Sequence, residues 1–265
     1  MVKKITKKIL FTIHIVLLGA DLKSKWILLK ETIRIQKNIY SHSDPHRYTC
    51  FIGNQKNKML ITFLGTIDEL HGLTEIFIDR CYEPRNKNVR TVLDLGANIG
   101  LASAWFKIKF PNSTIHSYEP DPRMYKMLVD NTNRMNNVST FNTAITAESG
   151  YVTFNSAERF FSSSIFSVPS STSITVRGES IDTAIKKMGT TIDVLKIDIE
   201  GAEFAAIKKS TLLVNVIEIC GELHPEKANV DANEFIENLR KTHRIIKSSI
   251  TGKSLFHAVK NNSGF

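Results

Sequence analysis

The 265-residue sequence has few cysteines, no long apolar segment and none of the common nucleotide-binding motifs. Its three cysteines stand far apart without a C-x-x-C spacing, which excludes a disulfide framework and favours reduced thiols in a cytoplasmic protein. The apolar run from Ile9 to Ala20 is too short to cross a bilayer as a helix. The patterns G-x-x-x-x-G-K-[ST], G-x-G-x-x-G and Y-x-x-x-K are all absent, which argues against P-loop enzymes, dinucleotide-binding enzymes and short-chain reductases.

Positive charge is concentrated at the N-terminus. The net charge is +9, of which residues 1–40 carry +7 and the other 225 residues carry +2. A nucleic-acid-binding groove would need basic residues around the functional site, so this distribution disfavours nucleic acid as a partner. A basic extension on a nearly neutral body is more typical of an arm that binds a membrane surface or another protein.

Residues 1–40 are consistent with three structures. Lysines before an apolar run resemble a signal peptide, but Leu18 and His14 do not suit cleavage after Ala20. The alternatives are a helix that docks at the inner face of the membrane and an amphipathic helix that packs on the body. Helical spacing of Trp26, Leu29 and Ile33, with Lys37 one turn further, suits either alternative.

Beyond this arm, the sequence predicts an α/β protein with three regions: the arm at 1–40, a small α/β subregion at 41–88 and a main domain at 89–265. Strands and helices alternate in the main domain, which predicts a Rossmann-like, mostly parallel seven-stranded sheet with helices on both faces and an antiparallel C-terminal strand. Strands are expected at 91–95, 114–118, 139–142, 151–154, 174–177, 192–197 and 214–220, with two more after residue 243. Helices are expected from about residue 100 and at 122–135, 180–188, 202–209 and 231–241.

The stretch "TVLDLGANIG" ends the first strand of that domain with a turn rich in small residues. Gly96 and Gly100 let the backbone approach a ligand, and the following helix points its N-terminal N–H groups at the same place. Asn98 stands where a dinucleotide-binding loop needs its second glycine, and Asp94 would repel a pyrophosphate. Asp94 instead suits the ammonium group of a methionine moiety, approached directly or through water.

A second acid follows the next strand. Glu119 ends the stretch "TIHSYE", 25 residues after Asp94, where a carboxylate can accept both hydroxyls of a ribose. Two acids at the ends of successive strands, with the glycine turn between them, predict a site for S-adenosylmethionine (SAM).

The motifs "VLDLGANIGLAS", "IHSYEPDP", "SSSI", "ESIDTAI" and "DVLKIDIEGAE" resemble, in this order, those of the FkbM family of SAM-dependent methyltransferases. The resemblance covers about residues 90–225 and implies a Rossmann-like sheet, methyl transfer most often to oxygen, and acceptors among sugars, polysaccharides and polyketides. The predicted cofactor-binding residues are Asp94, Gly96, Ala97, Asn98, Gly100, Glu119, Pro120, Asp121, Asn142, Ala144 and Asp198. The serine motif at 162–165 is a candidate for contact with the cofactor or a polar acceptor.

Candidate catalytic residues follow two later strands. Asp198 and Glu200 end the strand in "DVLKIDIEGAE", and His224 follows the next strand. Methyl transfer to a hydroxyl requires alignment of the acceptor and removal of its proton. His224, with a pKa near neutral, is the first candidate for the base, and Asp198 or Glu200 is the next. Glu203 is interpreted as a first-turn acid that favours the helix dipole.

Three alternatives concern a metal site, methylation of nucleic acid and a SAM-binding module without catalysis. Asp198, Glu200, Glu222 and His224 could together hold Mg²⁺, but nothing in their spacing requires a metal. A nucleic-acid methyltransferase that modifies base amino groups would be expected to carry an aromatic "NPPY"-like stretch, which is absent. A non-catalytic SAM-binding module is the remaining alternative. We therefore expect a SAM-dependent O-methyltransferase that acts on a glycan or glycan-like acceptor; the sequence leaves the oligomeric state open.

Overall fold

The computed structural model describes residues 2–37, 47–157, 171–248 and 254–261, and these fall into two compact units. The first unit contains residues 1–81 and 104–111, and the second contains residues 82–103 and 112–265. The two N-terminal regions predicted at 1–40 and 41–88 therefore lie mostly in one unit. The serine motif at 162–165 and the turn expected at Gly252 lie outside the described residues.

The first unit combines two helices, a hairpin and a short helical segment. Its elements are α1 (Val2–Leu17), α2 (Leu22–Lys37), β1 (Tyr48–Gly53), β2 (Lys58–Phe63), α3 (Ile67–Leu73) and the π-helical turn η1 (Thr74–Ile78). Helix α1 packs against α2, and α2 packs against β1. Thr66 and Glu69 form a capping box at the start of α3. The expected helix before Pro84 is thus α3 continued by η1.

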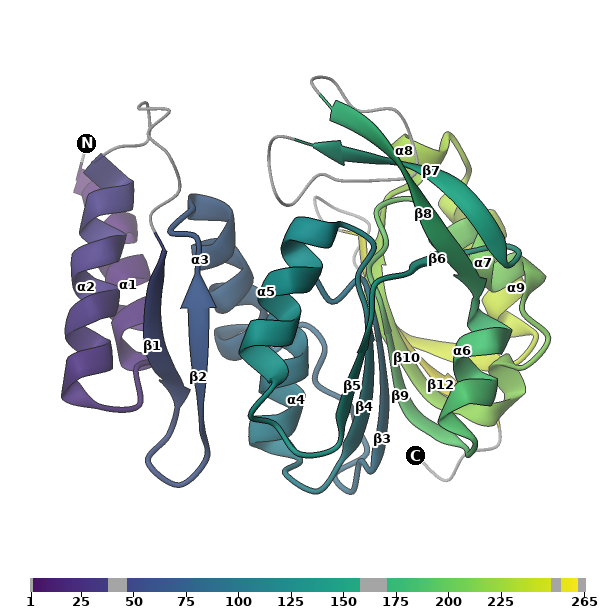
Figure 1. Cartoon of the computed structure of the whole chain (residues 1–265), viewed down its shortest axis with the longest axis horizontal. Coiled ribbons are helices and arrows are strands. Elements are labelled where there is room, and N and C mark those ends of the chain that lie inside the picture. Colours follow the sequence, from purple (N-terminus) through teal and green to yellow (C-terminus); the bar gives the residue numbers. More distant parts are fainter. Residues whose placement is uncertain (1, 38–46, 158–170, 249–253, 262–265) are drawn as a thin grey trace. The chain divides into compact units, whose positions relative to one another are not determined.

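A seven-stranded sheet forms the centre of the second unit, with the order β11-β12-β10-β9-β3-β4-β5 (Figure 1). The strands are β3 (Thr91–Leu95), β4 (Thr114–Tyr118), β5 (Val138–Phe141), β9 (Ile192–Ile197), β10 (Val216–Leu223), β11 (His243–Ser248) and β12 (Ser254–Lys260). Strands β5, β4, β3, β9 and β10 run parallel, and β12 is antiparallel to both β10 and β11. This confirms the predicted Rossmann-like fold class.

Helices cover both faces of this sheet. Figure 1 shows α5 on one face and α6, α7 and α9 on the other. The helices of the sequence after β3 are α4 (Leu101–Lys109), α5 (Pro122–Thr132), α6 (Ile181–Met188), α7 (Glu203–Lys209), α8 (Pro225–Ala228) and α9 (Ala232–Arg240), with a 3-10 turn η2 (Leu213–Asn215). The grouping into units assigns α4 from Ala104 onward to the first unit. Apolar residues of β3, β9 and β10 form the core with α6, α7 and α9, as expected for strands covered on both faces.

A second, three-stranded sheet follows β5. Its order is β6-β8-β7, formed by β6 (Ala144–Thr146), β7 (Gly150–Ala157) and β8 (Ser171–Ser180). The strands expected at 151–154 and 174–177 are therefore confirmed but longer than predicted, and they pair with each other. Strand β6 was not expected. It pairs with β8 and buries Ala144 against Phe154 and Val176.

Candidate functional site

The glycine turn after β3 is fixed by backbone contacts with the neighbouring strands. Gly96 has φ +81°, and a Cβ at this position would lie 1.8 Å from the carbonyl oxygen of Asp198. The N–H groups of Gly96 and Ala97 both donate to the carbonyl of Tyr118, at 3.0 and 2.9 Å. Only glycine allows β3 to turn so close to the end of β9. The turn therefore lies at the carboxyl ends of three adjacent strands, β4, β3 and β9.

Glu119 joins this turn to the end of β4. Its two carboxylate oxygens accept the N–H groups of Asn98 and Asp121, each at 2.8 Å. Burial raises the pKa of Glu119 to about 7, although both backbone hydrogen bonds lower it. Each carboxylate oxygen can accept a second hydrogen bond. The residue thus lies against the glycine turn with acceptor capacity remaining, which fits the ribose-binding role predicted for it.

Asp94 does not fit direct contact with a ligand in this structure. Its side chain has no exposed surface, and its carboxylate lies 3.2 Å from the ammonium of Lys196 and accepts a 2.6 Å hydrogen bond from Ser103. Lys196 also donates to the carbonyls of Leu95 and Gly96, at 3.3 and 2.5 Å. The ion pair beneath the glycine turn disfavours a direct approach of a ligand ammonium to Asp94, and the predicted approach through water stays a prediction.

Lys196 is the main residue at this site that the sequence interpretation missed. Burial acts to lower its pKa, but the charges of Asp94, Asp198 and Glu119, together with the hydrogen bond to Asp94, outweigh this and keep the pKa above its ordinary value. Lys196 stands opposite Asp94 in the register of β9 and β3. The sequence signal was a lysine inside an apolar strand, since buried lysines are rare without a partner.

Several other predicted cofactor residues have structural roles. Asp121 is buried and caps α5 by accepting the N–H of Arg123, and its predicted contact with a cofactor stays a prediction. Asn142 is exposed and donates to the carbonyls of Glu119 and Pro120, at 2.9 and 3.0 Å. The side chain of Ala144 is buried in the small sheet, and its predicted contact with the adenine stays a prediction. Asn98 adopts φ +50°, and its side chain accepts the N–H of Ile99.

Acidic and basic side chains gather where β9 and β10 end. His224 Nδ1 lies 3.1 Å from Glu203 Oε1, while His224 Nε2 lies 3.9 Å from Asp198 Oδ1 and 3.6 Å from Glu200 Oε2. Glu200 also pairs with Lys227. We call Asp198, Glu200, Glu203, His224 and Lys227 the acid–histidine cluster. The structure thus brings together all three residues predicted to be catalytic.

Glu203, within the cluster, and Tyr82, outside it, fix the positions of the other cluster residues. Glu203 is fully buried and accepts the N–H groups of Ile199 and Gly201 at 2.9 and 2.8 Å, so its role exceeds the helix-dipole effect predicted from sequence. Tyr82 donates a 3.0 Å hydrogen bond to Asp198 Oδ2. Glu200 has φ +58°, a left-handed conformation that is unusual for a glutamate and is often found at functional sites.

Ionisation in the cluster differs from the prediction. Burial acts to lower the pKa of His224, but its hydrogen bond to Glu203 and the charges of Asp198 and Glu200 raise it to about 9. The histidine is therefore protonated at neutral pH in this structure, and the expected pKa near neutral is wrong. Burial and the charge of Asp198 raise the pKa of Glu200 to about 6, against the opposing effect of His224 and Lys227. Glu200 is consequently ionised at neutral pH and only weakly basic.

The same side chains offer donors to a divalent cation. Asp198, Glu222 and His224 each provide one ligand atom, and these three atoms lie within 4.8 Å of one another. Because Nδ1 of His224 faces Glu203, Nε2 is the nitrogen that a metal would bind. Carboxylate oxygens suit Mg²⁺, and the imidazole suits transition metals better. The donors are thus compatible with a metal, although the sequence does not require one.

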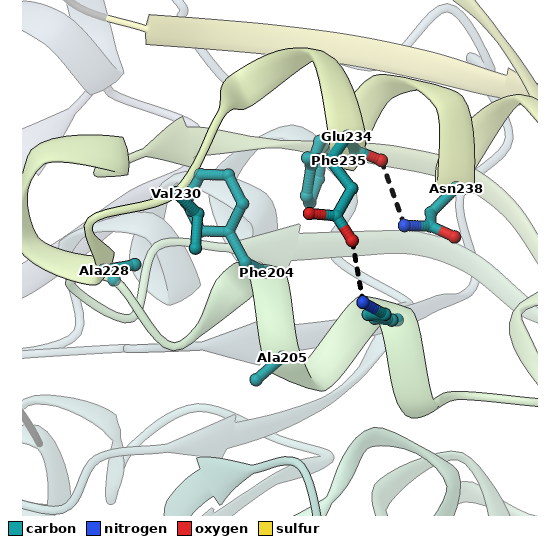
Figure 2. A pocket seen from close by; sticks show the side chains of 9 residues that line it. Phe204, Ala205, Ala228, Val230, Glu234, Phe235 and Asn238 are labelled. Carbon is teal, nitrogen blue, oxygen red and sulfur yellow. Dashed lines mark hydrogen bonds and ion pairs between the residues drawn. The ribbon is translucent and has the colours of Figure 1, made fainter.

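An apolar pocket lies beside the cluster. It encloses about 270 Å³ and is lined by Gly201, Phe204, Ala205, Lys208, Ala228, Val230, Glu234, Phe235 and Asn238. Figure 2 shows the side chains of Phe204 and Val230, which overlap in this view, and Glu234 paired to the lysine on α7. Gly201 and Ala228 of the lining directly follow Glu200 and Lys227 in the sequence, so the backbone that carries the Glu200–Lys227 ion pair adjoins the pocket. An apolar group held there would lie next to the candidate catalytic residues.

A family model and curated proteins match parts of this chain. The family model described as methyltransferase FkbM domain matches residues 94–245, more than half of the chain. Methyltransferase sdnD of Sordaria araneosa is 43% identical over 58 residues, which cover 22% of each protein. The 31-O-demethyl-FK506 methyltransferase FkbM of Streptomyces tacrolimicus is 41% identical over 51 residues, which cover 18% of this chain and 20% of that protein. These matches thus span only about a fifth of the curated relatives.

A solved structure resembles the chain over a greater length. The crystal structure of methyltransferase FkbM from Methylobacillus flagellatus KT aligns with a TM-score of 0.47 at 13% identity. The alignment covers 97% of this chain and 60% of that one.

Proposed function

Since this chain belongs to the methyltransferase FkbM domain family and is a SAM-dependent methyltransferase, we propose that it methylates a hydroxyl oxygen of a sugar, a glycan or a related natural product. The observation that carries this proposal is the acid–histidine cluster, which lies at the strand ends adjoining the glycine turn. A hydroxyl must lose its proton when it attacks a methyl group, and the cluster supplies groups that can take it.

The cofactor-binding residues follow from the glycine turn. SAM supplies a methyl group on a positively charged sulfur when it is bound. Glu119 would accept the ribose hydroxyls with its remaining lone pairs, and the N–H groups at the start of α4 face the same edge. Asp198 is the partly exposed acid nearest the turn, since its N–H donates to Leu95 at 3.1 Å. It takes over the role of ammonium acceptor first predicted for Asp94.

Glu200 is the proposed base. Its pKa of about 6 is close to neutral pH, where a general base is both ionised and able to accept a proton. With Glu200 as the base, His224 orients the acceptor oxygen and donates a hydrogen bond to it or to Asp198. Glu203 keeps the imidazole ring of His224 fixed through Nδ1. His224 is the second candidate for the base because its neutral form, present above pH 9, would be strongly basic.

Oxygen is the favoured acceptor atom for two further reasons. The name of the relative from Streptomyces tacrolimicus describes transfer to an oxygen of FK506. The apolar pocket beside Glu200 would also hold a ring or short aliphatic part of an acceptor that carries the hydroxyl. Both features favour a hydroxylated molecule with an apolar part.

The first test is calorimetric titration of the full chain with S-adenosylhomocysteine, with NADH as the negative control. Micromolar binding is expected, and Glu119→Gln should weaken it by at least about tenfold through loss of the ribose contacts. Glu237→Gln is the matched control, because Glu237 is 68% exposed on α9. Equal binding by Glu119→Gln and the parent would remove the ribose-binding role.

The second test identifies the acceptor atom. The protein is incubated with SAM carrying an isotope-labelled methyl group and with panels of hydroxylated sugars, polyketides and RNA. The proposal expects a methyl ether, recognised by nuclear magnetic resonance of the labelled carbon. Transfer to RNA or to a nitrogen would instead support another acceptor class, and cofactor binding without transfer to any panel would support a non-catalytic module.

A further inference from the structure

Large apolar side chains are exposed along the two N-terminal helices. Ten large apolar side chains are exposed in the described part of the chain, and seven of them lie on α1 or α2. These seven are Ile9, Leu10, Ile13, Leu17, Leu22, Trp26 and Ile33. Exposure reaches 66% for Trp26 and 86% for Leu22. Apolar groups gathered in this way mark an interaction surface rather than ordinary scatter.

The exposed residues of α2 form one stripe. At roughly 100° per residue, Leu22, Trp26 and Ile33 fall within about 40° of one another around the helix. The buried residues of this helix are Ser24, Leu28, Glu31, Thr32 and Ile35. The stripe predicted from the spacing of Trp26 and Ile33 is therefore the face turned away from the packed side of α2.

Helix α1 carries a similar stripe. Ile9, Ile13 and Leu17 recur every four residues and are all about half exposed or more. Within residues 6–17 only Ile15 is buried. On α2, Trp26 contributes an indole ring, a side chain that is enriched at membrane–water interfaces. Both helices of the contacting pair thus present an apolar face of the kind that enters the headgroup region of a bilayer.

Positive charge lies next to these stripes. Exposed lysines of the two helices are Lys7, Lys8, Lys23, Lys30 and Lys37. On α2, the three lysines lie on one side of the stripe, about 60–100° from Leu22 around the helix. Glu31 does not oppose them, because it is buried and paired with Arg34 at 2.6 Å. The surface is therefore apolar and basic together.

We propose that the exposed face of α1 and α2 binds the surface of a bilayer that contains anionic lipids. The apolar stripes would enter the headgroup region and the lysines would contact the negative surface. No helix in the described ranges has the length and hydropathy needed to cross a membrane. This inference does not depend on the acceptor proposed above.

Vesicle flotation with the full chain tests the proposal. Neutral phosphatidylcholine vesicles are compared with vesicles that contain about a third anionic phosphatidylglycerol, at low and high salt. The protein should float with the anionic vesicles and less at high salt. The double variant Leu22→Ser/Trp26→Ser should bind more than about tenfold more weakly. Lys23→Gln/Lys30→Gln should lose about fivefold for each lysine.

Controls separate this effect from misfolding and from self-association. Tyr151→Ser removes an 81% exposed ring of the second unit and should leave flotation unchanged. Emission of Trp26 should shift to the blue with anionic vesicles, since Trp105 is already buried. Absence of flotation by the folded protein at low salt would overturn the proposal. A dimer in sedimentation that the apolar double variant abolishes, without vesicle binding, would instead assign the face to a second copy of the chain.

Discussion

The functional surfaces proposed for the two units place costly side chains in opposite ways. The second unit buries charged groups at one sheet edge, where Asp94, Lys196 and Glu203 are each no more than 3% exposed. The first unit leaves Leu22 and Trp26 in water on α2. Neither arrangement favours folding by itself, because burial of charge requires a partner and exposure of apolar surface forfeits hydrophobic stabilisation. The buried charges of the second unit lie at the edge where SAM is proposed to bind, and the exposed apolar side chains of the first unit lie on the face proposed to bind a lipid surface.

The largest effect on stability is expected from substitution of Lys196, in the buried ion pair of the second unit. Lys196→Met removes the only cation that faces Asp94 among the described side chains and leaves a buried charge uncompensated. Such losses typically cost about 3–5 kcal/mol, so denaturant unfolding should show a large decrease in stability. The control Lys208→Met breaks a pair whose side chains are 62% and 55% exposed and should cost less than about 1 kcal/mol. Equal stability of both variants would mean that the buried pair does not support the turn.

Because of the acid–histidine cluster, the stability of the folded chain is expected to fall as the pH rises. The folded pKa of His224 is about 9, against 6.5 for an ordinary histidine, so the folded state holds a proton that the unfolded state releases. The stabilisation that protonated His224 gives to the folded state is complete below pH 6.5 and is lost as the pH rises to about 9. It amounts to as much as about 3 kcal/mol. Urea unfolding over this range should show the decrease in the parent protein. His224→Gln should lack it, and an identical decrease in that variant would assign the effect to other groups.

Activity separates the two candidate bases within the same cluster. If Glu200 accepts the proton, kcat/KM should rise with a midpoint near pH 6 and Glu200→Gln should lower kcat by about 100-fold or more. A midpoint near pH 9 would assign the base to His224. Glu226→Gln on α8 is the matched control, because Glu226 is exposed. A flat profile with full activity of Glu200→Gln would remove both residues from proton transfer.

Sequence patterns predicted much of the second unit because they are local. Runs of branched apolar residues predicted β3, β4 and β9 at their observed bounds, and the alternation of strands and helices predicted which strand ends would meet. Asp198, Glu200 and His224 were found in this way. The pairing of Asp94 with Lys196 could not be found, because the register between strands 100 residues apart brings them together.

The first unit shows a different limit of sequence patterns. The spacing of Trp26, Leu29 and Ile33 indicated a helix correctly but did not tell a buried stripe from an exposed one. Helix α2 buries Ser24 and Glu31, since Ser24 accepts the N–H of Phe51 at 2.9 Å and Glu31 pairs with Arg34. These polar residues are satisfied by distant or neighbouring partners, so hydrophobicity alone could not assign the buried face. The pKa of His224 likewise depends on three acids that only the fold assembles around it.

The smallest effect on stability is expected on α2, where an exposed and a buried apolar residue of the same helix can be compared. Trp26→Ala removes a large side chain from the exposed stripe and introduces the best helix former, so the stability of the chain in vesicle-free buffer should change by less than about 0.5 kcal/mol. Leu28→Ala, on the buried face of the same helix, should cost about 2–5 kcal/mol. Thermal unfolding followed by circular dichroism measures both. A loss for Trp26→Ala as large as for Leu28→Ala would mean that the ring stabilises the folded chain, and the need for a lipid partner to explain its exposure would disappear.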